Sequence, residues 1–293
     1  LGATSTIISS SGAQTISATV NGGQALTITA NGNLIISGAV GGSTDLSSYA
    51  VTTTGSASQT FSANVETTGN QTYTAAGGIV TSGAITFDSS GGTVNFASAL
   101  SGNNNVTVTG NADIDGAITS IAVLSISGTS NIGADITTSG TQTYTGAVTL
   151  SANVTLTSSG DVITFSNTVN SADSTNRNLT VTTGGDTVHI NFDGIVGGSQ
   201  GLGAIAITGV LDLNAAIADA NSLTVSGASL LDANVTTSGN QTYSGAITLG
   251  TAARTLAGSI IQTVAVDGAQ NLTITGNLDL NGAITEVADF SVS

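Results

Sequence analysis

One block of this sequence recurs almost verbatim, and the repetition constrains the fold more than any single residue does. Residues 232–249 match residues 134–150, and both contain Gln-Thr-Tyr followed by a Gly-Ala-(Ile or Val)-Thr-Leu segment. A shorter copy occupies residues 63–73. A chain built from one supersecondary unit copied many times is typical of solenoids and other repeat architectures.

A second motif recurs out of step with the first. Residues 106–118 match residues 205–217 and 272–284, so the interval from Gly110 to Gly209 is 99 residues and that from Gly209 to Gly276 is 67. The interval from Tyr73 to Tyr144 is 71 residues. These values indicate a large unit of 67 to 71 residues, one copy of which carries an insertion. Within it, strand-like segments recur at about twenty residues, the length of one coil of a parallel β-solenoid.

Short-range patterning favours strands over helices. Apolar residues alternate with polar ones, as in Leu278-Asp-Leu-Asn281, and no helical spacing is sustained. Val, Ile and Thr dominate the alternating segments, and Gly and Asn separate them. The chain contains no proline, which suits a structure whose strands nearly all pair on both sides. The sequence therefore predicts an all-β fold.

The chain lacks a linker, a charge run or a shift of composition. We therefore expect residues 1–293 to form a single continuous solenoid domain. At roughly twenty residues and ~4.8 Å per coil, it would have about fourteen coils and a length of roughly 65–70 Å. Residues 290–293 and 1–16 continue the repeat pattern when placed end to end. We expect that neither end is capped and that the chain is a segment of a longer repetitive protein or stacks head to tail.

Charge and composition disfavour several classes of function. Only 6% of the residues are charged, the formal net charge is -15, and the two basic residues are Arg177 and Arg254. An acidic chain without a basic patch is poorly suited to nucleic acid or to anionic lipid. No apolar run is long enough to span a membrane as a helix. Cys and Met are both absent, which is a pattern found in large exported bacterial surface proteins.

The repeat Leu-Thr-Ile-Thr-Gly-Asn-Leu-Asp-Leu-Asn-Gly-Ala-Ile of residues 272–284, in coils near twenty residues, resembles two related groups. These are the filamentous-haemagglutinin-type exoproteins and the giant β-strand-repeat surface proteins of bacteria. The resemblance covers the whole chain. It implies a right-handed parallel β-helix, an extracellular or cell-surface location, and a role in adhesion or matrix building, including biofilm matrix. The amino-terminal secretion domain of two-partner-secreted members is not present in this stretch.

Several residues are candidates for chemistry. His189 lies in the segment Asp186-Thr-Val-His-Ile-Asn-Phe-Asp193, where it could act as a general base or a metal ligand. A lone histidine between Val188 and Ile190 is equally compatible with an outward strand position, which we favour. The sequence predicts no catalytic, cofactor-binding or metal-binding residues, and we expect the chain not to be an enzyme.

The second motif carries a recurring acidic side chain. Asp113, Asp212 and Asp279 occupy equivalent positions, where alternation should point their carboxylates outward. The residues two positions further on share the same face; they are Asp115, Asn214 and Asn281. Such pairs offer oxygen ligands to calcium, although the full repeat-type calcium motif is absent. We expect a solvated face, with weak surface calcium as the alternative and no other cofactor.

The tyrosines of the first motif offer two interpretations. Tyr73, Tyr144 and Tyr243 could form an aromatic ladder that binds glycans, but Ile16 and Phe61 replace tyrosine in variant copies. This replacement favours apolar packing. Seven Asn-x-Thr triplets are also possible glycosylation sites. They begin at Asn70, Asn105, Asn153, Asn178, Asn234, Asn240 and Asn271.

Together these observations predict a structural repeat segment of a secreted bacterial surface protein, which forms a rigid rod or an extracellular fibre. We expect its main partner to be itself, through end-to-end or edge pairing of coils, without nucleic acid and without membrane insertion. The alternatives are a stalk that binds glycans or a host surface, and a polysaccharide-active enzyme like the pectin-degrading enzymes built on parallel β-helices. A groove that clusters carboxylates with either arginine would favour the enzyme.

Overall fold

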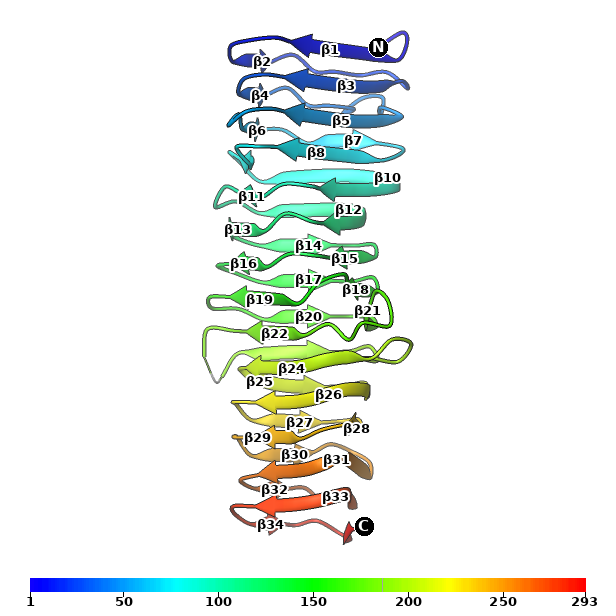
Figure 1. Ribbon diagram of the computed structural model, residues 1–293, viewed down its shortest axis with the longest axis vertical. Coiled ribbons are helices and arrows are strands. Elements are labelled where there is room, and N and C mark those ends of the chain that lie inside the picture. The colour runs from blue at the N-terminus through cyan, green and yellow to red at the C-terminus, as the bar shows by residue number, and fades with distance from the viewer. Residues whose placement is uncertain (186) are drawn as a thin grey trace. The chain divides into compact units, whose positions relative to one another are not determined.

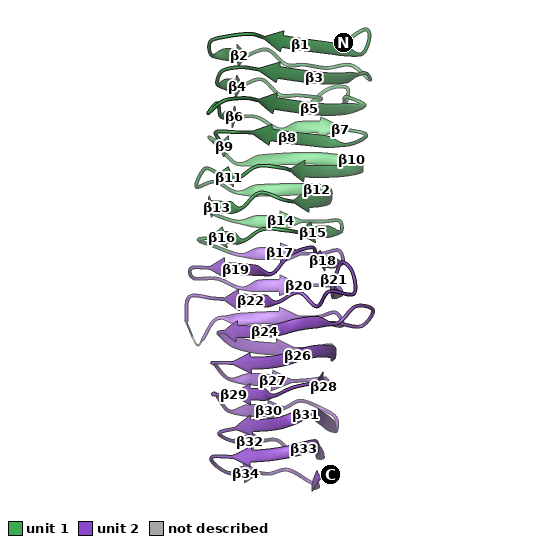
Figure 2. Ribbon diagram, viewed as in Figure 1, with its two compact units in different colours: residues 1–140 green, residues 141–293 purple. Residues whose placement is uncertain are grey.

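Parallel strands stacked in short coils make up the fold, as a computed structural model of residues 1–185 and 187–293 shows (Figure 1). The chain divides into two units, Leu1–Gly140 and Thr141–Ser293 (Figure 2). All strand pairs described in both units are parallel, and the described residues contain no helix. The prediction of an all-β parallel solenoid is confirmed. The expectation of a single domain over residues 1–293 stays a prediction.

Unit 1 has three faces, which we name 1A, 1B and 1C in the order in which the chain first reaches them. Face 1A contains β1 (Ser5–Ser9), β3 (Ala25–Ala30), β5 (Ser48–Thr53), β8 (Gln71–Ala75) and β15 (Ser130–Ile132). Face 1B contains β2 (Gln14–Ile16), β4 (Leu34–Ile36), β6 (Gln59–Phe61), β9 (Ile79–Thr81), β11 (Leu100–Ser101), β13 (Ile118–Ile121) and β16 (Ile136–Thr138). Face 1C contains β7 (Val65–Thr67) and β14 (Leu124–Ile126). The long strands β10 (Ile85–Phe96) and β12 (Val106–Ile114) turn a corner and run from face 1C to face 1A.

Unit 2 also has three faces, named 2A, 2B and 2C in the same way. Face 2A contains β17 (Gln142–Tyr144), β20 (Ile163–Phe165), β23 (His189–Phe192), β25 (Val210–Leu213), β27 (Ser229–Leu231), β30 (Ile247–Leu249), β32 (Val266–Asp267) and β34 (Ile284–Thr285). Face 2B contains β18 (Val148–Leu150), β21 (Val169–Ser171), β28 (Val235–Thr237) and β35 (Phe290–Val292). Face 2C contains β19 (Val154–Ser158), β22 (Leu179–Thr182), β24 (Leu202–Thr208) and β29 (Gln241–Tyr243). Three long strands run from face 2B to face 2C, namely β26 (Ile217–Val225), β31 (Arg254–Thr263) and β33 (Leu272–Leu280).

The register of paired strands gives the coil length directly. On face 1A, successive partners are Ile7, Ile28, Val51, Tyr73, Phe96, Ile114 and Ile132, which are 18 to 23 residues apart. On face 2C, successive partners are Val154, Leu179, Ile205, Leu223, Gln241, Ile261 and Leu278, which are 17 to 26 residues apart. The coil of about twenty residues predicted from the sequence is therefore confirmed.

The interior of each unit is a column of inward residues from all three faces. Alternation leaves every second strand residue buried, as in β5, whose Tyr49 and Val51 are each 1% exposed. Aromatic rings fill two parts of the interior. In unit 1, Tyr73 packs against Phe61, Phe87 and Phe96 at ring-centroid distances of 5.1 to 5.7 Å. In unit 2, Phe165 stacks on Tyr144 and on Phe192, at 5.3 and 4.9 Å. Each such pair adds about 0.5–1.5 kcal/mol beyond the area that it buries.

Candidate functional sites

The repeated Gln-Thr-Tyr motif forms a buried polar staple. Both Gln and Tyr point inward and are 0–1% exposed in all three copies. The tyrosine hydroxyl donates to the Oε1 atom of the glutamine two residues earlier, at 2.7 Å from Tyr73, 2.9 Å from Tyr144 and 3.0 Å from Tyr243. The packing interpretation of these tyrosines is confirmed, and their rings present no surface to a glycan.

The glutamine of the staple also bonds to the backbone of a neighbouring coil. Gln71 Nε2 donates to the carbonyl oxygen of Asp88 at 2.6 Å, and Gln241 Nε2 donates to that of Ala257 at 2.8 Å. The preceding threonine closes the corner, since Thr67 Oγ1 donates to Gly69 O at 2.5 Å. A buried amide whose donors and acceptor are paired avoids the cost of desolvation. The sequence analysis identified the tyrosine but did not predict that the glutamine is buried.

The corner glycine of the motif is required by close packing. A Cβ atom on Gly69 would lie 2.4 Å from Ser47 O, and one on Gly239 would lie 2.6 Å from Asn221 O. Both partners are backbone atoms of the preceding coil. The motif thus combines a corner that only glycine fits with a strand that begins with a buried glutamine.

The three equivalent aspartates of the second motif point outward, as predicted, and two of them, Asp113 and Asp279, accept hydrogen bonds from amide side chains. Asp113 accepts from Asn95 Nδ2 at 2.7 Å and from Asn131 Nδ2 at 2.9 Å. Asp115 accepts from the same Asn95 amide at 3.0 Å. Asp279 accepts from Gln262 Nε2 at 3.4 Å. Asp113 and Asp115 therefore share one amide donor, Asn95, whereas Asp212 contacts a histidine.

His189 lies at the outward edge of β23 and pairs with Asp212 of the next coil. Its Nδ1 atom is 2.6 Å from Asp212 Oδ2, and the two side chains are 50% and 21% exposed. Asp193 instead accepts from Asn214 Nδ2 at 2.7 Å. Asp186, the other acid of the candidate segment, lies outside the described residues. The outward strand position favoured for His189 is confirmed, and the exposed pair is a surface contact worth about 0–1 kcal/mol.

Each arginine pairs with a single aspartate in the part of the chain that the structure describes. Arg254 is 7% exposed; its Nε donates to Leu231 O at 2.8 Å and its Nη2 lies 3.4 Å from Asp232. Arg177 pairs with Asp173 at 3.3 Å on the surface, and this contact, after the backbone and hydroxyl hydrogen bonds from Thr175, helps to lower the pKa of Asp173. Among the described residues, no group of three or more His, Cys, Asp or Glu side chains could hold a metal ion. Weak surface calcium stays a prediction.

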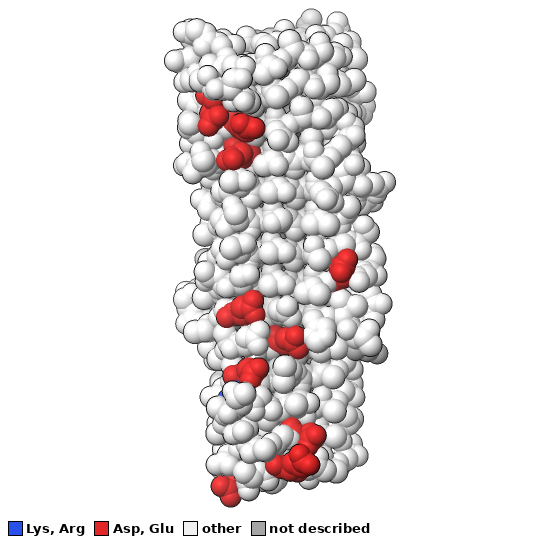
Figure 3. Space-filling model, turned by 180° about the vertical axis from the view of Figure 1, so that it is seen from behind, with Lys and Arg blue, Asp and Glu red and all other residues white. Residues whose placement is uncertain are grey.

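Acidic side chains gather in separate patches with uncharged surface between them (Figure 3). In unit 1, Glu66 and Asp88 occupy paired positions on face 1C. Partial burial raises the pKa of Asp88, and the nearby charge of Asp45 raises it further. One Asp88 carboxylate oxygen is buried without a hydrogen-bond partner, so ionisation of this residue destabilises the folded state.

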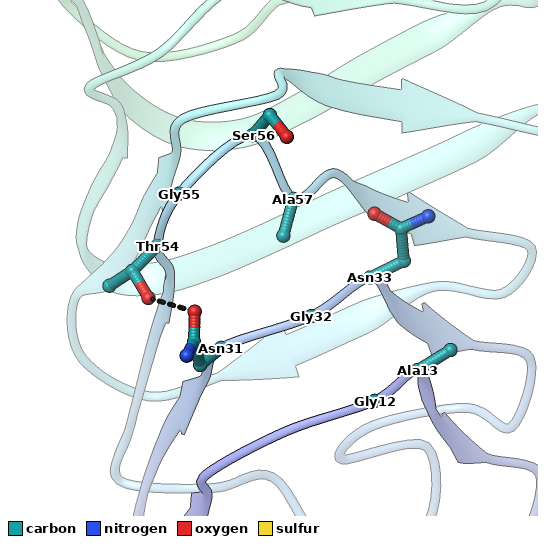
Figure 4. Close-up of a pocket in the computed structure, with 9 residues that line it drawn as sticks. All are labelled: Gly12, Ala13, Asn31, Gly32, Asn33, Thr54, Gly55, Ser56 and Ala57. Carbon is teal, nitrogen blue, oxygen red and sulfur yellow. Dashed lines mark hydrogen bonds between the residues drawn. The ribbon is translucent and has the colours of Figure 1, made fainter.

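A hollow of about 430 Å³ lies at the corner between faces 1A and 1B (Figure 4). Glycines, alanines and short polar side chains line it, and Thr54 Oγ1 donates to Asn31 Oδ1 at 3.2 Å across two coils. Its lining contains no charged or aromatic side chain. The hollow therefore lacks the acid, base and stacking groups that glycoside chemistry uses.

All seven Asn-x-Thr triplets begin at an exposed corner. At four of them the asparagine Oδ1 accepts from a backbone N–H of the next coil, at 2.8 to 3.0 Å. These four are Asn70, Asn153, Asn178 and Asn234. A local structural role thus accounts for asparagine at these corners. An intact-mass measurement tests whether any of them carries a glycan.

The fold and these sites define the class of the chain as a parallel β-solenoid repeat protein. No family model, no curated protein and no solved structure matches it. Among the described residues, no helix is long and apolar enough to cross a membrane.

Proposed function

We propose that the chain is a structural, non-enzymatic repeat segment of a bacterial surface protein, which extends by pairing of coils into a rod or fibre outside the cell. Its role would be in adhesion or in building a matrix. The observation that carries the proposal is the use of the repeated residues. In the copy at residues 63–73, Gln71 and Tyr73 serve the interior of the coil, and Thr67 and Gly69 serve its corner, so these four residues form no outer site.

Apolar interior surface at two strand edges supports self-association. Ile7 of β1 points inward like its partner Ile28, but it is 45% exposed, whereas Ile28 is 2% exposed. Phe290 and Val292 of β35 are 42% and 49% exposed, although they pair with buried positions of β33. Each edge also presents backbone groups that a further parallel strand could pair with. We infer that further coils cover these edges, either those of a longer repetitive protein or those of a second copy that stacks end to end.

Adjacent residues on β1 provide a matched test. Ile7→Asp places a charge at the inward edge position, whereas Ile8→Asp places the same charge at the outward neighbour, which is 76% exposed. We expect the unmodified chain and Ile8→Asp to form filaments under electron microscopy as concentration rises, and Ile7→Asp to stay monomeric. Monodisperse monomers of the unmodified chain at high concentration would refute the proposal.

A glycan-binding stalk receives less support. Four tyrosines and five of the six phenylalanines are fully buried, so that among the described residues Phe290 is the one exposed aromatic ring. Sugar-binding surfaces commonly stack rings of the ligand on aromatic side chains. Retention of the chain on a glycan array would nevertheless favour this second function.

A further inference from the structure

Outward threonines form a two-column array on face 1A. Strands β1, β3, β5 and β8 pair in parallel, and their outward positions fall into two ranks. One rank is Thr6, Thr27, Ala50 and Thr72, and the other is Ile8, Thr29, Thr52 and Thr74. We call these eight positions the threonine face; six of them are threonine.

The hydroxyl groups of the threonine face are free to bond outside the protein. None of the six has a hydrogen-bond partner within the part of the chain that the structure describes. The inward threonines at the corners differ, since Thr53 and Thr67 donate to corner carbonyl oxygens. Each threonine hydroxyl can both donate and accept, so the face offers the two capacities that a water molecule needs.

The threonine face is also uncharged. None of the 17 acidic residues and neither arginine lies on β1, β3, β5 or β8. In a chain with a net charge of -15, this leaves a surface of methyl and hydroxyl groups. A ligand for it must be neutral, because an ion would find no partner there.

The spacing of the array favours a periodic ligand. Neighbouring strands lie about 4.7–4.9 Å apart, and residues two apart on a strand are separated by about 6.6 Å. Eight equivalent positions at these intervals suit a flat lattice better than a single small molecule. Oxygen atoms at the surface of hexagonal ice repeat at comparable distances.

A second array with six outward threonines occurs in unit 2. On face 2C, the outward pairs are Thr155 and Thr157, Thr180 and Thr182, Ala206 and Thr208, and Thr224 and Ser226. Again six of the eight positions are threonine and one is alanine; the eighth is Ser226, whose Oγ accepts from Gly209 N at 3.3 Å, and Thr155 also has a partner within the protein. The Leu-Thr-(Ile or Val)-Thr segment of residues 26–29 recurs at residues 179–182, and a related segment occupies residues 223–226, so the two arrays share part of the repeat sequence.

From these observations we propose that the two threonine arrays bind the ordered water lattice at the surface of ice. Ice is favoured over a crystalline polysaccharide, because the arrays contain hydroxyls and methyls but no aromatic ring. Binding would slow the growth of large ice grains at the expense of small ones.

The test measures ice recrystallisation in thin frozen sucrose films containing the 293-residue chain. One variant places lysines within both arrays, at Thr29, Thr52, Thr182 and Thr208. A control variant places four lysines at outward positions of other faces, at Thr15, Thr60, Thr86 and Thr248. Circular dichroism and urea unfolding check that both variants fold.

We expect the unmodified chain and the control variant to keep the grains small, and the array variant to allow the same grain growth as buffer. A second variant with valine at the four array positions keeps the methyl groups and the fold, and we expect it to lose at least part of the inhibition. Grain growth in the unmodified chain equal to that in buffer would overturn the proposal, as would full inhibition by the lysine array variant. Retention on crystalline cellulose or chitin without an effect on ice would instead assign the arrays to a polysaccharide lattice and would also overturn it.

Discussion

The variant copy of the staple on face 1B provides a sharp test of the interior. Gln59 is fully buried, and its Nε2 donates to Val51 O at 3.2 Å and to Thr74 O at 2.8 Å. Its Oε1 has no partner. The reason is visible in the sequence, because position 61 is phenylalanine, whereas the three complete copies have a tyrosine that donates to this oxygen.

Phe61→Tyr should therefore stabilise the protein. The new hydroxyl lies two residues after the glutamine, as in the three complete copies, where the two atoms are 2.7 to 3.0 Å apart. A typical intramolecular hydrogen bond contributes about 0.5–1.5 kcal/mol, and pairing a buried orphan acceptor recovers part of a penalty of about 1–3 kcal/mol. We expect a gain of about 1 kcal/mol. The reverse change, Tyr243→Phe, orphans Gln241 Oε1 and should cost about 1–3 kcal/mol.

Phe165→Tyr is the matched control, because Phe165 is equally buried but follows Ile163 at the position two residues earlier. The same added hydroxyl would find no glutamine there, and we expect a loss of about 1–3 kcal/mol. The assay is equilibrium urea unfolding followed by circular dichroism, with hydrogen exchange of the local amides as a second readout, because repeat proteins can unfold in stages. A neutral or destabilising Phe61→Tyr, or a Phe165→Tyr that stabilises as much, would refute the staple as an energetic unit.

Further predictions concern the corners and the ionisable groups. Gly110 has φ +104°, and an added Cβ would lie 2.2 Å from Ser89 O. Gly110→Ala should therefore cost more than about 2 kcal/mol in urea unfolding, of which about 1–3 kcal/mol arises from the backbone conformation alone. Gly83→Ala is the control and should be nearly neutral, because its Cβ would meet nothing within 4 Å. Desolvation is the larger cause of the raised pKa of Asp88, and the charge of Asp45 is the smaller one, so the ionised carboxylate destabilises the fold. Asp88→Asn should therefore raise the free energy of unfolding at pH 7. Asp45→Asn should lower the pKa of Asp88 in an NMR titration. Burial raises the pKa of all four tyrosines, so the unfolded chain loses the tyrosine protons at a lower pH than the folded chain does. The free energy of unfolding should therefore be constant below about pH 10 and fall above it, by roughly 1.4 kcal/mol per tyrosine per pH unit. Urea unfolding at a series of pH values from about 8 to about 12 measures this. His189→Ala should change neither unfolding nor filament formation measurably, with a stability change within about 0.5 kcal/mol; a larger effect would show that its contact with Asp212 does more than we infer.

The sequence predicted the coil and the inward tyrosines because both follow from short-range alternation. Ile16 and Phe61 at the tyrosine position already indicated an apolar environment. The same reasoning missed the buried glutamine, because period-two alternation says where Gln71 points but not that its polar atoms find partners in the interior. Those partners lie on a neighbouring coil, at Asp88 O, and this register is not visible from the local sequence.

Candidate chemistry was predicted less completely for a related reason. Sequence proximity suggested that His189 and the acids of its own segment act together, but its partner is Asp212, 23 residues away on the next coil. In a parallel solenoid, outward side chains meet their neighbours one coil further on, so spacing near twenty residues matters more than adjacency. Arg254 shows the same effect, since it bonds to Leu231 and Asp232, whereas Arg177 pairs with Asp173, four residues earlier.

The equivalent motif copies of unit 2 lie on different faces, and this explains why the long repeat interval is not a whole number of coils. Tyr144 belongs to face 2A and Tyr243 to face 2C, and likewise Asp212 belongs to face 2A and Asp279 to face 2C. The repeated structural unit is therefore one corner together with the strand that follows it, and copies of this unit occur on more than one face of unit 2. Duplication of such units keeps apolar residues inward but moves outward residues from one face to another.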